Sequence, residues 1–257
     1  MKMIWISSLA RDQEKVQETM AMLKTYAMEV NGHFWEDDLE KMAWLGPREE
    51  LIKEDTALWL ILSTDESLAA RSVRYGLSLL ALSAQAARGH GFPIMMLHEG
   101  EIPGAETLPT PLQGAEVLAA DNPGIGAKIV ATVNMPAKKV PVEYRLDIYA
   151  MPKLGQWFEV GPADSSWKGA MFGVCGAEID AHGVGPAGKL PQKAVLEYPM
   201  KGLKLAIGEK DYTAWAVKNP LDGASSYYVR VQGEPGSILL GPLAEGDDAE
   251  GYVLDLG

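Results

Sequence analysis

Residues 57–63 form a run that stays apolar until its last position, Ser63. A strand without a polar face is stable only where both faces of its sheet are covered, which is typical of a central strand in a parallel sheet. The run therefore favours an α/β architecture, with helices packed on both faces of the sheet.

The segments around this run alternate between strand-like and helix-like patterns. Predicted strands are residues 3–7, 33–37, 57–63, 92–97 and 115–119, and predicted helices are residues 12–30, 47–55, 66–88 and 123–133. In the first helix, apolar residues recur at spacings of three and four, as in Val16, Met20 and Leu23. Right-handed crossovers between such strands predict an open, doubly wound, five-stranded parallel sheet in a domain at residues 1–134.

Beyond a linker at residues 134–141 the apolar period changes to two. Tyr144, Leu146 and Ile148 alternate with charged residues, and the pattern returns at residues 203–207, 212–216, 227–231 and 252–256. Segments rich in Gly, Pro and Asn separate these runs. The pattern predicts seven to nine short strands in a β-sandwich or barrel domain at residues 142–257.

Charge and hydropathy exclude several classes of protein. The chain has 23 basic and 35 acidic residues, a net charge of −12, so it lacks the basic patch with which nucleic-acid-binding proteins neutralise phosphates. No apolar run approaches the ~18 residues of a membrane span, and the first residues enter a strand-like run without the pattern of a signal peptide. With a single cysteine, Cys175, we expect a cytoplasmic protein with no nucleic-acid or membrane partner.

Several segments resemble bacterial TIR domains. Trp5, Ile6, Ser7 and Asp12 lie in a stretch similar to the opening of those domains. Further similar segments follow in the same order: residues 32–37 for the second strand, Gly46 and residues 51–55 after it, residues 60–63 for the third strand and residues 92–94 for the fourth. The resemblance covers residues 3–98. It implies a flavodoxin-like fold, which nucleoside deoxyribosyltransferases share, and makes self-association as a dimer a candidate interaction.

The chain departs from both families at the residue expected to act on the ribose. In TIR enzymes that cleave NAD, a glutamate lies six residues after the serine that opens the third helix, and counting from Ser72 gives Ser78. Deoxyribosyltransferases carry a glutamate two residues before a helix glycine, and the equivalent position before Gly76 is Arg74. Neither side chain can place an anionic oxygen against a developing oxocarbenium charge. We therefore expect a non-catalytic protein and assign no catalytic residue.

Doubly wound sheets bind ligands at the carboxyl ends of their strands. The candidate ligand-binding residues follow the first three strands or open the third helix: Ser7, Ser8, Arg11, Trp35, Asp37, Ser63, Arg71 and Arg74. Arginines suit phosphate, serines donate hydrogen bonds and tryptophan stacks on rings, so the predicted ligand is nucleotide-like. The sequence has no glycine-rich dinucleotide or triphosphate loop, and we predict no cofactor.

Two polar clusters are weak metal candidates. The acidic loop at residues 36–40 is better explained by solvation. Strict strand alternation would put Glu178, Asp180 and His182 on one face, where ligands in line converge poorly on one ion, so we predict no metal. His98 has no serine or cysteine partner nearby in the sequence, which leaves a hydrolase triad unsupported.

Three functions remain open from the sequence. The favoured one is a non-catalytic TIR-like protein that binds a nucleotide-derived small molecule or a partner protein, with the β domain as an interaction surface. The others are an N-glycosidase-type enzyme that uses a different carboxylate, and a structural assembly module.

Overall fold

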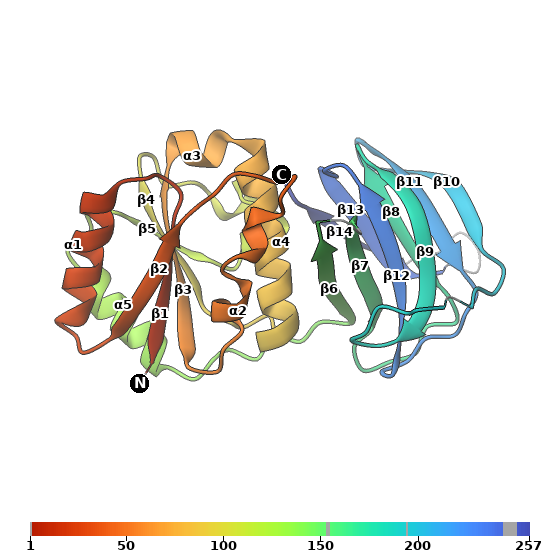
Figure 1. The fold of residues 1–257 in the computed structure, drawn as a ribbon, viewed down its shortest axis with the longest axis horizontal. Coiled ribbons are helices and arrows are strands. Elements are labelled where there is room, and N and C mark those ends of the chain that lie inside the picture. Colours follow the sequence, from red (N-terminus) through yellow and green to blue (C-terminus); the bar gives the residue numbers. More distant parts are fainter. Residues whose placement is uncertain (1, 153–154, 194, 244–250) are drawn as a thin grey trace. The chain divides into compact units, whose positions relative to one another are not determined.

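The computed structural model describes residues 2–152, 155–193, 195–243 and 251–257 (Figure 1). The chain divides into two compact units, Met1–Val140 and Pro141–Gly257. Within the described ranges, no helix is long and apolar enough to cross a membrane.

The first unit is a five-stranded parallel sheet in the order β2-β1-β3-β4-β5. Its strands are β1 (Met3–Ser8), β2 (Glu29–Phe34), β3 (Thr56–Thr64), β4 (Ile94–Glu99) and β5 (Glu116–Ala119). Its α-helices are α1 (Gln13–Lys24), α2 (Arg48–Leu51), α3 (Asp65–Ala69), α4 (Arg71–Arg88) and α5 (Ile125–Asn134). Strand order and direction confirm the predicted doubly wound sheet, which is compatible with a flavodoxin-like fold.

Strand β3 explains why helices cover both faces of this sheet. Leu58, Leu60 and Leu62 pack into an apolar core that includes residues of α1 and α5. Trp59 and Ile61 alternate with them and are 0% exposed, so the opposite face is also buried. Figure 1 shows α1 and α5 on one side of the sheet and α2 and α4 on the other.

Several of the predicted elements have the wrong bounds. The first helix ends at Lys24 and not at residue 30, because Ala27 takes a positive φ of 58° and the next residues pair with β1 as β2. The second strand therefore begins four residues earlier than predicted, at Glu29. The helix predicted at residues 66–88 is two helices, because Ala70 is extended between α3 and α4.

The second unit consists of two antiparallel sheets, in the orders β6-β7-β12-β9 and β10-β11-β8-β13-β14. The strands are β6 (Tyr144–Met151), β7 (Gly155–Pro162), β8 (Ala170–Cys175), β9 (Glu178–Pro186), β10 (Met200–Ile207), β11 (Lys210–Val217), β12 (Ser225–Gln232), β13 (Ser237–Pro242) and β14 (Tyr252–Asp255). Phe158 of one sheet and Phe172 of the other have ring centroids 5.2 Å apart. The unit is therefore a β-sandwich, the first of the two predicted all-β alternatives.

The predicted shared face of Glu178, Asp180 and His182 is wrong. Between β9 and β12 the register shifts, so that Asp180 bulges from the ladder. His182 is buried with its Nδ1 2.7 Å from the Tyr227 hydroxyl, whereas Asp180 accepts a hydrogen bond from Arg230. The residues that the structure describes contain no group of three or more side chains placed to hold a metal ion.

A buried carboxylate links three segments of the β-sandwich. Glu159 of β7 is 4% exposed and accepts hydrogen bonds from the Tyr149 hydroxyl, the Ser226 hydroxyl and the Gly188 amide, at 2.7–2.8 Å. These donors lie on β6, on β12 and in the segment after β9. Because each donor needs an acceptor, the carboxylate holds that segment against the sheet.

Replacing Glu159 with Gln turns one acceptor oxygen into a donor and leaves a buried donor without a partner. We expect E159Q to lower the free energy of unfolding by about 1–3 kcal/mol. Urea denaturation of the full chain measures the change, with the exposed Glu178→Gln on β9 as the matched control. Equal stability of the two variants would contradict the role of Glu159.

His33 of β2 is held as a neutral imidazole. The indole Nε1 of Trp5 lies 3.2 Å from His33 Nδ1 and donates to it, which requires an unprotonated Nδ1. Burial lowers the pKa of His33 from 6.5 to about 4. The unfolded chain therefore takes up this proton at a higher pH than the folded chain does.

From this difference we expect His33 to reduce the stability of the α/β unit as the pH falls from 6.5 to about 4. Thermal unfolding of the natural chain and of H33N at pH 7, 6, 5 and 4 isolates the contribution of His33 to this loss of stability. The variant should lose less Tm across this window. Parallel Tm curves for the two proteins would show that His33 does not contribute.

A candidate small-molecule site at the carboxyl edge of the parallel sheet

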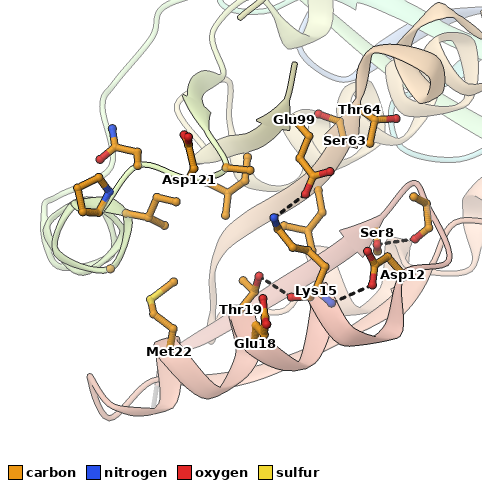
Figure 2. Close-up of a pocket in the computed structure, with 18 of the residues that line it drawn as sticks. Ser8, Asp12, Lys15, Glu18, Thr19, Met22, Ser63, Thr64, Glu99 and Asp121 are labelled. Carbon is orange, nitrogen blue, oxygen red and sulfur yellow. Dashed lines mark hydrogen bonds and ion pairs between the residues drawn. The ribbon is translucent and has the colours of Figure 1, made fainter. Parts of the chain in front are cut away.

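A cavity of about 380 Å³ lies at the carboxyl ends of β1, β3, β4 and β5 (Figure 2). Helix α1 forms one wall, and the segment that leads into α5 forms another. Apolar side chains from the strands and both helices line its interior: Met22, Leu62, Leu97, Ala120 and Ile125. The cavity therefore lies on the face of the sheet that α1 and α5 cover.

The polar lining of the cavity is mixed, and its charged groups are mostly acidic. It comprises the carboxylates Asp12, Glu18, Glu99 and Asp121, the ammonium of Lys15, and the neutral groups of Ser8, Thr19, Ser63, Thr64 and Asn122. A ligand in the cavity thus meets four carboxylates, one ammonium and several groups that can orient it by neutral hydrogen bonds.

Lys15 and Glu99 point toward one another across the cavity (Figure 2). The Nζ of Lys15 lies 2.5 Å from Oε1 of Glu99, and the two side chains are 35% and 47% exposed. Their hydrogen bond raises the pKa of Lys15. Helix α1 presents the lysine because Asp12 caps its first turn, accepting from the Lys15 amide at 2.9 Å.

An aromatic ring stands beside the cavity, where α1 approaches α5. Tyr26, two residues beyond α1, lines the cavity and is 44% exposed. A Cβ atom on Gly126 of α5 would lie 2.3 Å from Cε2 of this ring. Glycine at position 126 is therefore what allows the tyrosine to pack closely against the start of α5.

At the same sheet edge, Ser63, His98 and Asp65 form a hydrogen-bonded chain. Ser63 Oγ lies 3.0 Å from His98 Nδ1, and His98 Nε2 lies 2.9 Å from Asp65 Oδ1. An ionised carboxylate only accepts, so in neutral His98 the proton is on Nε2 and Ser63 donates to Nδ1. Sequence alone did not pair these residues, which come together because Ser63 and His98 are register partners on β3 and β4.

The order of groups in this chain is that of a hydrolase triad, but Ser63 and His98 are only 3% and 2% exposed. Its evident effect is structural. It joins the ends of β3 and β4 to Asp65, the first residue of α3, which begins at a capping box formed by Thr64 and Ser67. The side chains that follow the two strands are thereby held in place at the sheet edge.

Of the residues predicted from the sequence, Ser8 and Ser63 line the cavity. The other six do not belong to its lining. Ser7 is fully buried and accepts a hydrogen bond from Trp59 Nε1, and Trp35 is 6% exposed against Gly76 of α4. Both therefore serve the packing of the unit.

The charged residues predicted from the sequence have other surroundings. Asp37 accepts a hydrogen bond from Ser72, and the guanidinium of Arg74 donates to the Thr107 carbonyl. Burial lowers the pKa of Arg74. Arg11 and Arg71 are exposed.

Ser78, at the position where the TIR resemblance places a glutamate, is 0% exposed within α4 and donates to the Arg74 carbonyl. This position therefore has a buried hydroxyl that is bonded within its own helix.

Sequence reasoning missed Lys15, Glu99, Asp121 and Asn122, all of which line the cavity. A signal for three of them was present. Glu99 ends β4, and Asp121 and Asn122 follow β5. Doubly wound sheets bind ligands at the carboxyl ends of their strands, so the ends of the last two strands are candidates as much as those of the first three. Lys15 gave no such signal, because a lysine in the first turns of an amphipathic helix is ordinarily solvated.

Comparisons with known proteins found neither a protein-family model that matches this chain nor a curated protein that matches it. The TIR resemblance consequently rests on the segments quoted from the sequence. The structure supports the fold that this resemblance implies, since its five-stranded parallel sheet is compatible with a flavodoxin-like fold.

Removing the Ser63 hydroxyl leaves the buried Nδ1 of His98 without its donor. We expect S63A to lower the free energy of unfolding by about 1–3 kcal/mol. Ser72→Ala, which removes an exposed hydrogen bond to Asp37, is the matched control and should cost less. Chemical denaturation of both variants tests this, and a larger loss in the control would refute the structural role of the chain.

Proposed function

We propose that the α/β unit is a non-catalytic, TIR-like binding module, and that it holds a nucleotide-derived small molecule in the cavity at the carboxyl edge of its sheet. The observation that carries this proposal is the place of the cavity, where doubly wound sheets ordinarily bind ligands. Its volume of about 380 Å³ lies at the small end of the ~300–1,000 Å³ typical of small-molecule sites.

The lining offers complementary contacts for such a ligand. Leu62, Leu97 and Ile125 provide an apolar surface for a planar base, and the ring of Tyr26 can stack on it. The Ser8 hydroxyl and the Asn122 amide can bond the polar edge of a base or a sugar. In this proposal the β-sandwich unit supplies an interaction surface for a partner protein.

The absence of catalysis is proposed from the position that should carry the reactive carboxylate. Buried Ser78 occupies it, and a hydroxyl bonded to a backbone carbonyl cannot stabilise positive charge on a ribose. Ser78 lies on α4, outside the cavity lining, so the TIR resemblance assigns no catalytic carboxylate to the cavity.

One observation favours a second function, an N-glycosidase that uses a different carboxylate. Glu99 reaches the cavity from the end of β4, the type of position that catalytic residues occupy in open α/β sheets. Incubation with NAD or a nucleoside, followed by chromatography, decides between the two functions. Release of nicotinamide or a free base by the natural chain, and its loss in E99Q, would replace the binding proposal with this one.

The binding proposal is tested by filling the cavity. Ala10 lines it, so we expect A10W to occupy part of its volume. A thermal-shift panel of nucleosides, nucleotides and NAD should raise the Tm of the natural chain, since a ligand at 100 times its Kd contributes about 2.7 kcal/mol. The increase should disappear in A10W.

Ala163→Trp is the matched control, since Ala163 is a partly exposed alanine of the β-sandwich unit, outside the cavity lining. It should keep the ligand-induced increase in Tm. No shift with any compound would overturn small-molecule binding and leave the partner-protein role. A shift that persists in A10W would place the ligand elsewhere on the chain.

A further inference from the structure

The charges around the cavity bear on which part of a nucleotide it can hold. Four carboxylates line it, and among the described residues of the lining Lys15 supplies the one ammonium. A phosphate placed among these groups would be repelled by the carboxylates. The lining is thus mainly negative, whereas a phosphate site needs positive charge.

Lys15 cannot compensate for the acids while it is paired with Glu99. Its Nζ lies 2.5 Å from Glu99 Oε1, so the ammonium is already neutralised by a carboxylate of the same cavity. To bind a phosphate, the lysine would have to exchange one anionic partner for another and leave Glu99 unpaired beside the ligand.

Two helix starts near the cavity could attract an anion, but an amide at each of them already has a side-chain acceptor. At the start of α1, the Lys15 amide donates to Asp12, whose carboxylate already provides negative charge there. Ahead of α5, the Gly124 amide donates to the Asn122 side chain at 2.8 Å. Asp121 lies directly before that turn and lines the cavity, which further opposes an incoming phosphate.

We infer that the cavity selects an unphosphorylated ligand, a nucleoside rather than its nucleotide. Glu99 sets this specificity because its ion pair with Lys15 keeps the ammonium from binding a phosphate. This inference rests on the proposed small-molecule function and specifies its ligand class. The apolar interior and Tyr26 take the base, the hydroxyls and Asn122 take the sugar edge, and the Lys15–Glu99 pair excludes the 5′-phosphate.

The test compares each of four nucleosides (adenosine, guanosine, cytidine and uridine) with its 5′-monophosphate by calorimetry on the full chain. For the nucleoside that binds most tightly, we expect the monophosphate to bind at least about tenfold more weakly. The difference should widen at low salt, where repulsion between charges is least screened.

Glu99→Gln removes one carboxylate and frees Lys15. We expect E99Q to bind the monophosphate about tenfold more tightly than the natural chain does, with a change of less than about threefold for the nucleoside. The double variant K15M/E99Q should lose this gain, since the freed ammonium is its source. The matched control is Glu116→Gln, which breaks an ion pair with Lys128 outside the cavity lining and should leave both affinities unchanged.

The outcomes separate the two levels of the proposal. A monophosphate that binds the natural chain as tightly as its nucleoside, or an E99Q variant with unaltered preference, overturns the specificity inference and leaves small-molecule binding intact. If no nucleoside or monophosphate binds, this inference fails, and the proposed function fails with it unless NAD raises the Tm of the natural chain.

Discussion

The α/β unit depends on one constraint, the burial of β3 on both faces. Leu58, Leu60 and Leu62 face one layer of helices, and Trp59 and Ile61 face the other, so a polar side chain in mid-strand would need a buried partner. The polar side chains therefore lie at the ends of the strands. Serines, a threonine, a histidine and a glutamate gather where β1, β3 and β4 end, and the cavity lies among them.

The polar groups at this edge are divided between the two faces of the sheet. On one face, the His98 side chain is buried in a hydrogen-bonded chain with Ser63 and Asp65. On the other, Glu99 extends into the cavity and meets Lys15. The first set stabilises the strand ends, and the second set remains available to a ligand. Adjacent residues of β4 thus serve different purposes because strand geometry points them to opposite faces.

Much of the fold could be predicted from the sequence, because it follows from local patterns. The apolar run at residues 57–63 required a covered sheet, and the change to a period of two beyond residue 141 required a different architecture. The errors arose where a single residue overrides its pattern. Ala27 adopts a positive φ, Ala70 is extended within a helix-like segment, and Asp180 bulges from its ladder. Nothing in these residue types marks such conformations, which the tertiary structure imposes.

The candidate site was less predictable than the fold. Ser8 and Ser63 could be found because they end strands, but the predicted Arg74 bonds the Thr107 carbonyl and the predicted Asp37 bonds Ser72. Whether a polar residue near the sheet edge faces a cavity depends on helix placement. The pairing of Lys15 with Glu99 joins residues 84 positions apart, and only the packed structure brings them together.

The division of β4 between two faces also affects the thermodynamics of any binding event. His98 is held by hydrogen bonds to Ser63 and Asp65, so the backbone that carries the neighbouring Glu99 is already ordered before a ligand arrives. Little conformational entropy then remains to be lost on association, and the adjustable parts are the side chains of Lys15 and Tyr26. A site of this kind is expected to bind with only a small rearrangement of its main chain, so that differences in affinity between related ligands appear mainly in how slowly they dissociate.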